Sequence, residues 1–408
     1  MVKEVSEMES FLQAVKVTEK VYWVGAIDWA IKDFHGYSTE RGTTYNAFLI
    51  LSDKITLVDT VKAPFIDEMF ARISSIIDPS KIDYIISNHS EPDHSGALPE
   101  TIRRVKPQKI FASLMGEKNL KAHYSIDQEI TPVKTGDSVS LGNMTVDFIE
   151  TRMLHWPDSM FSYLREEKVL FSQDAFGMHL ASDRLFADEI EHEVLYWEAE
   201  KYFANILMPY SQQVQKLAAD LPGFNLDIKT LAPDHGPLWR KNISEIIGWY
   251  VDWSAQKPEN FAIVVYDTMW QSTALMARSI ADGIKNSGSR VELIPLSAKD
   301  RSYVATKLLR AGALVVGSPT LNNNIFPTLS DVLTYVKGLR PKNKIGVAFG
   351  SYGWGGEAAK QVDDILKSMD VEIVSEPLRM KYVPKENDLK KCFELGAAIS
   401  ATLREKTK

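Results

Sequence analysis

The pattern of hydrophobic and polar positions predicts two different folds along the chain, with a change near residue 250. Before that point, short apolar runs are joined by tight polar turns, as in residues 46–51 and 55–58. Such pairs are typical of antiparallel β-hairpins. Between the hairpins, residues 64–77 carry apolar side chains at helical spacing. We therefore expect an α/β domain with much antiparallel sheet over residues 1–254.

Beyond a short polar segment that contains Pro258, strand-like and helix-like runs alternate strictly. The strand-like runs are residues 262–266, 291–295, 313–317, 344–349 and 372–375, and the helix-like runs are residues 274–286, 303–311, 329–336 and 357–369. Alternation of this kind is typical of a doubly wound parallel sheet with helices on both faces. Residues 255–408 are therefore predicted to form a second domain of that class.

Composition and charge exclude several classes of protein. Hydrophobic residues make up 45% of the chain and charged residues 25%, as in ordinary globular proteins. The 47 basic and 54 acidic residues leave a net charge of −7 without a concentrated basic stretch, so no nucleic-acid partner is expected. The longest apolar runs are too short to cross a membrane, and the first residues lack the apolar core of a signal peptide. We expect a cytoplasmic protein.

The strongest chemical signal lies in residues 88–96, directly after a strand-like run. Four side chains that bind metals, His89, Glu91, Asp93 and His94, fall within six residues there. In an extended loop the first three point to one side, and a turn at the last pair can direct it elsewhere, so one loop can serve two metal ions. Imidazole and carboxylate ligands favour a transition metal over calcium or magnesium. The single cysteine, Cys392, excludes a cysteine-based zinc or iron–sulfur module.

Two metal ions need further ligands, and three isolated residues are candidates. His155, Asp174 and His235 each follow an apolar run and stand near Gly or Pro, as expected of loops at a sheet edge. The local sequence leaves a ligand role and a structural role equally open for these three. For His123, His179 and His192 a structural role is the simpler interpretation.

The order of these residues resembles the metallo-β-lactamase-fold domain of flavodiiron proteins. Zinc hydrolases of that fold carry His-x-His-x-Asp-His, whereas Glu91 stands here where their second histidine would be. A carboxylate at that position makes the site harder and more anionic, which suits iron. The resemblance extends over essentially the whole chain. It implies a metallo-β-lactamase-like αββα sandwich followed by a flavodoxin-like doubly wound parallel sheet.

Position by position, the resemblance also implies roles for individual residues. One iron would be bound by His89, Glu91 and His155, and the other by Asp93, His94 and His235, with Asp174 bridging the two. His35 and Tyr196 match positions near the site in the family and are candidate catalytic residues. For Tyr196, packing in the protein core explains its presence equally well.

Three loops of the second domain resemble the FMN-binding loops of flavodoxins. Each follows the carboxyl end of a predicted parallel strand, where such sheets bind ligands. The first offers hydroxyl groups at a helix N-terminus for the phosphate, although the glycine usual in the middle of this loop is missing. The other two offer polar backbone and an aromatic side chain for the flavin ring. The candidate FMN-binding residues are Thr268, Met269, Trp270, Gln271, Ser272 and Thr273, then Ser318, Pro319, Thr320, Leu321, Asn322 and Asn323, then Ser351, Tyr352, Gly353, Trp354 and Gly355.

The resemblance implies an oxidoreductase that uses FMN and two iron ions per chain to reduce O2 to water, NO to N2O, or both. With no rubredoxin module in the chain, electrons are expected from a separate donor such as rubredoxin, or F420 in some relatives. Two other classes remain open: a dizinc hydrolase of the metallo-β-lactamase fold, and a flavodoxin-like electron carrier with a structural first domain. The preferred substrate and the donor are not determined by the sequence.

A head-to-tail homodimer, or a dimer of such dimers, is also expected. The linker enters the second domain at the amino end of its first strand, whereas the flavin loops lie at the carboxyl end, roughly 16 Å further for five residues. Flavin from one chain would therefore face iron of the other.

Overall fold

The computed structural model describes residues 12–408, so the expected absence of a signal peptide concerns residues outside the described part. The chain divides into two compact units. The first runs as far as Val251, apart from Gly36–Ser38 and Phe203–Ser211, and these two segments join Asp252–Lys408 in the second unit. They do so because both contact the helix that contains Ser302: Ser38 N donates to Ser302 Oγ at 2.9 Å, and Asn205 Nδ2 donates to Ser302 O at 3.3 Å. The predicted division into residues 1–254 and 255–408 assigns neither of these two segments to the second domain, and it stays a prediction.

Within the described residues, the first unit contains two large sheets. One is a seven-stranded sheet in the order β1 (Val15–Lys16), β2 (Val21–Trp23), β7 (Phe48–Ile50), β8 (Thr56–Val58), β9 (Tyr84–Ser87), β10 (Lys109–Ser113) and β11 (Ile130–Val133). The other has five strands: β12 (Ser138–Ser140), β13 (Thr145–Glu150), β14 (Met160–Leu164), β15 (Val169–Gln173) and β16 (Thr230–Pro233). The predicted hairpins β7–β8 and β12–β13 are antiparallel, as expected.

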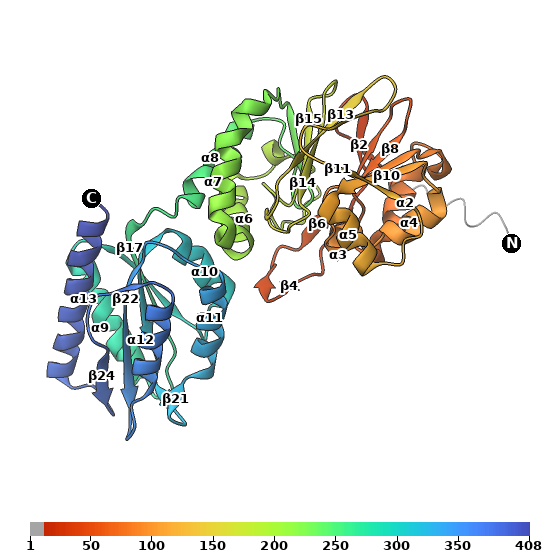
Figure 1. Ribbon diagram of the computed structural model, residues 1–408. Coiled ribbons are helices and arrows are strands. Elements are labelled where there is room, and N and C mark those ends of the chain that lie inside the picture. The colour runs from red at the N-terminus through yellow and green to blue at the C-terminus, as the bar shows by residue number, and fades with distance from the viewer. Residues whose placement is uncertain (1–11) are drawn as a thin grey trace. The chain divides into compact units, whose positions relative to one another are not determined.

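The two sheets enclose one core, and helices cover their outer faces (Figure 1). Successive side chains of a strand point to opposite faces of the sheet, so both faces of β7 are buried. Phe48 and Ile50 point into the core between the sheets, whereas Leu49 points toward the helices. The helices on that side are α2 (Ile66–Ser74), α4 (Leu98–Val105) and α5 (Leu114–His123). On the side of the second sheet, Tyr250 packs on Phe176 at 4.8 Å between ring centroids. The predicted αββα sandwich is confirmed.

The chain up to Ser254 contains further strands and helices, of which those within residues 36–38 and 203–211 belong to the second unit. These further elements are β3 (Ala26–Asp28), β4 (Asp33–Phe34), β5 (Tyr37–Ser38), β6 (Thr43–Tyr45), α3 (Pro92–Ser95), α6 (His192–Tyr202), α7 (Ser211–Asp220) and α8 (Ile243–Ser254), with single turns at Ala63–Phe65, Pro79–Lys81, Ala187–Glu189, Phe203–Leu207, Met208–Tyr210 and Leu221–Phe224. Strands β3 and β6 pair antiparallel, which leads the chain into Thr43 and Thr44 beside the metal ligands described below.

The second unit is built on a parallel sheet, as predicted. Its order is β18 (Arg290–Pro295), β17 (Glu259–Tyr266), β19 (Ala311–Gly317), β22 (Ile345–Tyr352) and β23 (Glu372–Ile373), with β24 (Leu378–Lys381) also paired to β22. This is the flavodoxin-like order 2-1-3-4-5. A small hairpin, β20 (Thr320–Leu321) and β21 (Asn324–Ile325), follows β19.

Helices cover both faces of this sheet (Figure 1). Along β17, Ile263 and Val265 face α10 (Arg301–Arg310), α11 (Pro327–Gly338) and α12 (Ala358–Ser368), whereas Ala262 and Val264 face α9 (Ser272–Asn286) and α13 (Glu386–Lys406). The pattern of the sequence did not predict α13 or β24. No helix of residues 12–408 is long and apolar enough to cross a membrane.

Candidate functional site

The metal motif lies where β9 ends and α3 begins. Glu91 is the N-cap of α3 with an extended backbone, and Pro92 fills the first helical position, where its missing N–H leaves no donor unused. His89 precedes this cap, whereas Asp93 and His94 lie in the first turn of the helix. The motif is divided at this point between two groups of candidate metal ligands.

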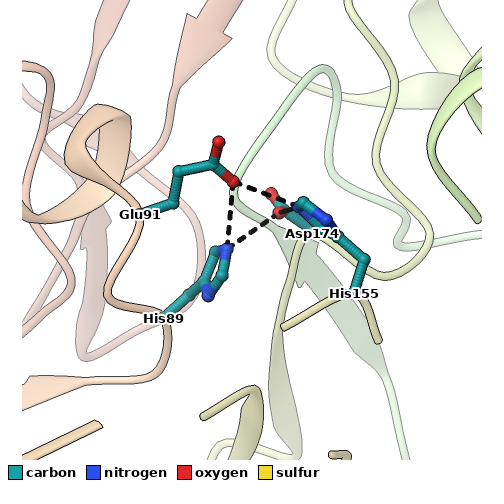
Figure 2. Close-up of side chains that lie close together, drawn as sticks. All are labelled: His89, Glu91, His155 and Asp174. Carbon is teal, nitrogen blue, oxygen red and sulfur yellow. Dashed lines mark hydrogen bonds and ion pairs between the residues drawn. The ribbon is translucent and has the colours of Figure 1, made fainter. Parts of the chain in front are cut away.

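The first group contains His89, Glu91, His155 and Asp174, whose ligand atoms all lie within 4.8 Å of one another. Figure 2 shows the four side chains converging, with His89 and Glu91 on the loop after β9 and with His155 and Asp174 on other segments. His89 Nε2 lies 3.3 Å from Glu91 Oε2 and 3.3 Å from Asp174 Oδ2. His155 Nε2 lies 3.1 Å and 2.9 Å from the same two oxygen atoms.

The second group contains Asp93, His94 and His235. Asp93 Oδ2 lies 3.1 Å from His235 Nε2 and 3.4 Å from His94 Nε2. The other oxygen of Asp174, Oδ1, lies 3.1 Å from His94 Nε2 and 3.5 Å from His235 Nε2. One oxygen of Asp174 thus faces each group, which is the geometry of a carboxylate that bridges two metal ions.

The chemistry of these residues fits two iron ions. Asp93 Oδ1 and Oδ2, His94 Nε2 and Asp174 Oδ1 are buried and form no hydrogen bond within residues 12–408. Buried polar atoms normally have partners, and metal ions would supply them here. Burial raises the pKa of Asp174, but His94 and the hydrogen bonds from His155 and His89 outweigh it and hold the pKa well below its ordinary value. Its carboxylate is therefore anionic, and with no thiolate in either group the ligands suit iron.

A further layer of contacts orients the histidine rings. Asp158 Oδ2 lies 3.3 Å from His89 Nδ1 and accepts a hydrogen bond from Ser90 N at 2.7 Å. His235 Nδ1 donates to Thr44 O at 2.6 Å. Because these partners engage Nδ1, Nε2 of both rings is left facing the metal positions. Asp158 was not among the residues that the sequence indicated for the site, although it follows the candidate ligand His155 by three positions.

Asp158→Asn is expected to weaken iron binding by about 10–100-fold while the fold persists, because the charge behind His89 is lost but the shape is kept. Competition for ferrous iron against a coloured chelator measures this affinity. Asp183→Asn is the matched control, since the side chain of Asp183 is 83% exposed in the same unit. An affinity equal to that of the unchanged protein would show that Asp158 does not act through His89.

Of the two predicted catalytic residues, His35 lies beside the first ligand group. Its Nε2 is 3.8 Å from Glu91 Oε1, and its side chain is 78% exposed. Tyr196 instead packs its ring 5.0 Å from that of Trp249 and donates a hydrogen bond to Glu200 Oε1. These contacts match the packing alternative for Tyr196, and its catalytic role stays a prediction.

Tyr202 and His179, neither of which the sequence singled out for the site, lie beside His235. The His179 ring is 4.6 Å from the His235 ring and 5.1 Å from the Tyr202 ring. Burial and the nearby His235 lower the pKa of His179 well below its ordinary value, so the ring is neutral. Thr43 Oγ1 lies 2.8 Å from its Nδ1. His123 and His192 lie outside both ligand groups.

The second unit contains a cavity of about 690 Å³ at the carboxyl ends of the parallel strands. Its lining includes most of the predicted flavin residues: Met269, Trp270, Ser272, Pro319, Thr320, Leu321, Asn322, Asn323, Ser351, Tyr352, Gly353, Trp354 and Gly355. Four predicted residues, Thr268, Gln271, Thr273 and Ser318, are not among the lining residues, whereas Tyr382 and Val383, which were not predicted, are.

The first loop of this cavity has the features of a phosphate site. The side-chain hydroxyl of Thr268 is buried and has no hydrogen-bond partner in the described part of the chain. Gln271 precedes α9 with φ +67°, so it adopts the left-handed conformation that the missing glycine would take without strain. The hydroxyl of Thr273 lies 2.8 Å from Ser351 Oγ and ties the first loop to the third, and its binding of phosphate stays a prediction. Ser272 lines the cavity directly.

Aromatic side chains complete the fit to a flavin. Trp270 and Trp354 line the cavity and are 88% and 84% exposed. Large apolar rings are rarely so exposed unless a partner covers them, and a planar flavin ring is such a partner. The cavity therefore fits FMN, and the placement of its phosphate at the first loop and its ring near the tryptophans stays a prediction.

Comparisons with known proteins agree with both sites. Residues 43–236 match the family model described as "ODP family beta lactamase", and residues 264–396 match the model for flavodoxin. The chain is 47% identical to a "Nitric oxide reductase" of Moorella thermoacetica over 96% of this chain and 100% of that protein. It is 42% identical to the "Rubredoxin-oxygen oxidoreductase" of Megalodesulfovibrio gigas over 97% of this chain and 99% of the relative.

Solved structures show the same architecture over nearly the whole chain. The rubredoxin oxygen:oxidoreductase from Desulfovibrio gigas superposes with a TM-score of 0.95 at 42% identity, covering 97% of this chain and 99% of that one. The flavodiiron protein from Giardia intestinalis gives a TM-score of 0.93 at 31% identity, covering 98% of each chain. The protein thus belongs to the flavodiiron family, and its cofactors are FMN and two iron ions.

Proposed function

We propose that this protein is an oxidoreductase that reduces O2 to water, NO to N2O, or both, with electrons that pass through FMN. The observation that carries the proposal is Asp174, whose two oxygen atoms face two complete groups of His and acid ligands. Relatives named nitric oxide reductase and rubredoxin-oxygen oxidoreductase support both substrates.

When bound, the iron ions and FMN supply the redox chemistry, and the protein supplies position, shielding and protons. Glu91, Asp93 and Asp174 offset the positive charge of the metals in a buried site. Aromatic rings flank His235 and exclude water: Tyr45 at 6.0 Å and Phe34 at 6.4 Å between ring centroids.

Protons must also reach the substrate during reduction. His35 is suited to deliver them, because its Nε2 lies 3.8 Å from Glu91 Oε1 while its ring remains in contact with solvent. It would take a proton from solvent and release it at the edge of the metal site.

The two alternative functions are less well supported. A dizinc hydrolase needs neither the carboxylate at Glu91 nor a flavin cavity in the same chain. A simple electron carrier needs no further domain such as the first unit, which holds two groups of candidate metal ligands. Metal analysis and a visible spectrum of the purified protein would distinguish these classes.

The direct test is anaerobic turnover of the reduced protein with O2 and with NO in parallel. We expect the flavin and iron to be reoxidised by at least one of the two gases, with water or N2O as the product. Native zinc with ester or thioester hydrolysis, and no reoxidation by either gas, would contradict the proposed function.

The electron donor is proposed to be a separate rubredoxin. The name of the Megalodesulfovibrio gigas relative includes this donor. An iron–thiolate site is held by several cysteines, whereas the 408 residues of this sequence contain only Cys392, so these residues do not supply the donor site themselves.

We further propose a head-to-tail homodimer as the working unit. The chain enters the second unit near Asp252 and reaches β17 at Glu259, whereas the flavin loops follow the carboxyl end of β17. Eight residues of strand place that end roughly 26 Å beyond Glu259. A two-fold related partner would bring each flavin to the metal site of the other chain without a long linker.

Complementation is expected in mixtures of two inactive chains. Asp174→Ala removes the bridging metal ligand, and Ser272→Asp places a negative charge where the phosphate is expected. Heterodimers should regain activity at one of their two sites, as measured by NO or O2 consumption. Absence of rescue in heterodimers whose formation is proven would show that electrons move within one chain.

A further inference from the structure

Besides the three predicted loops, a fourth segment of the chain lines the flavin cavity, and the sequence pattern did not predict it. Tyr382 and Val383 line it, and both follow β24, the strand paired to β22. We propose that Tyr382 is a positioning residue for the flavin, which contacts the ring system rather than the phosphate and holds it against the third loop. This inference rests on the flavin assignment in the proposed function and adds a specific contact to it.

Backbone pairing fixes Tyr382 to the third loop. Strands β22 and β24 run parallel with Tyr352 opposite Lys381, and the next residue continues the pairing, since Tyr382 N donates to Tyr352 O at 2.7 Å. Tyr352 belongs to the third loop and also lines the cavity. The position of Tyr382 is therefore coupled to the segment that faces the flavin.

The ring of Tyr382 approaches the third loop at a glycine. A Cβ atom added at Gly353 would lie 3.5 Å from Tyr382 Cε1, so the ring lies close to the backbone at this position. The neighbouring residue is the exposed Trp354. Tyr382 and Trp354 thus present two aromatic surfaces to the same cavity.

The backbone at Tyr382 is strained, and its side chain is largely exposed. Its φ is +57°, a left-handed conformation that is unfavourable for a bulky side chain. The residue is nevertheless 63% exposed, and Val383 is 64% exposed. Residues held in such conformations tend to serve ligand binding. The occupant that would cover both side chains is the flavin ring, which is planar, largely apolar and matched to the aromatic lining.

The phosphate is an unsuitable partner for this side of the cavity. The anion site is formed by Ser272 and the N-terminus of α9, with Thr268 nearby, on the loop after β17. Strand β24 pairs with β22, and β19 lies between β22 and β17 in the sheet. Changes at Tyr382 should therefore alter recognition of the ring, and changes at Ser272 should alter recognition of the phosphate.

The test compares FMN and riboflavin binding to the full-length, iron-loaded protein after removal of its flavin, by quenching of flavin fluorescence. Tyr382→Asn suits the left-handed backbone and removes the ring. We expect it to weaken FMN and riboflavin by the same factor, about tenfold. Tyr382→Phe should stay within about twofold of the unchanged protein, because the ring remains. Ser272→Ala should weaken FMN alone, and Phe393→Ala, an exposed aromatic away from the cavity, should change neither affinity.

A second measurement separates positioning of the flavin from support of the fold. The unfolding temperature of the flavin-free Tyr382→Asn protein should be equal to or above that of the flavin-free unchanged protein, since strain is relieved and little burial is lost. An unfolding temperature that falls together with the affinity overturns the inference, as does unchanged affinity for both flavins. If the unchanged protein binds neither flavin, the flavin assignment itself is wrong and this inference falls with it.

Discussion

Asp174→Ala is expected to remove most of the iron and to lower the rates of O2 and NO reduction by more than about a hundredfold. Loss of a residue that only orients a metal ligand costs up to about a hundredfold, and loss of a ligand itself should cost more. The reason is that Asp174 is shared: its Oδ2 lies 2.9 Å from His155 Nε2 and its Oδ1 lies 3.1 Å from His94 Nε2. Loss of the side chain therefore removes a ligand from both metal ions and an anionic charge from a buried cationic site.

FMN content is the internal control in this experiment. The flavin cavity is formed by residues of the second unit, so Asp174→Ala should retain FMN in the same amount as the unchanged protein. Metal analysis gives the iron content, and the absorbance of flavin released by denaturation gives FMN. Asp183→Ala, at an exposed acid of the first unit, should change neither content nor rate. Full iron content in Asp174→Ala would rule out the bridging role.

Riboflavin is expected to bind at least about a hundredfold more weakly than FMN. The phosphate can accept hydrogen bonds from Ser272 and from the unpaired N–H groups at the start of α9, and hydrogen bonds to a charged group each contribute about 1.5–3 kcal/mol. Two such contacts account for about a hundredfold. Titration of the flavin-free protein with each compound, followed by fluorescence, measures the two affinities.

Substitutions in the first loop sharpen this prediction. Ser272→Ala should weaken FMN and leave riboflavin unchanged, because only the phosphate contact is lost. Thr273→Ala tests the neighbouring predicted phosphate ligand, whose buried hydroxyl lies 2.8 Å from Ser351 Oγ. Equal affinity of the unchanged protein for FMN and riboflavin would remove the phosphate assignment from this loop.

Local sequence determined those features of the protein that depend only on residues close together in the chain. Alternating strand and helix patterns are enough to predict a doubly wound sheet, because each pattern buries one face of one element. The flavin loops were predictable because the carboxyl ends of parallel strands necessarily meet at one edge of the sheet. His89, Glu91, Asp93 and His94 were recognisable because four ligands fall within six residues.

The isolated ligands could not be chosen with the same certainty from their surroundings. His155, Asp174 and His235 stand in loops that resemble those of the other histidines, so local sequence left them undecided. In the structure, β15 and β16 lie side by side in parallel, with Gln173 opposite Pro233. This register brings Asp174 and His235 out of the sheet together, although about sixty residues of chain lie between them.

Tertiary packing alone decided the finer features of both sites. Asp158 reaches His89 across 69 positions of sequence, and the hydroxyl of Thr273 meets that of Ser351 across 78 positions. Tyr382 enters the flavin cavity only because β24 pairs with β22 and the chain then takes a left-handed conformation. Sequence patterns report which face of an element is buried, whereas these contacts depend on which elements become neighbours and in which register.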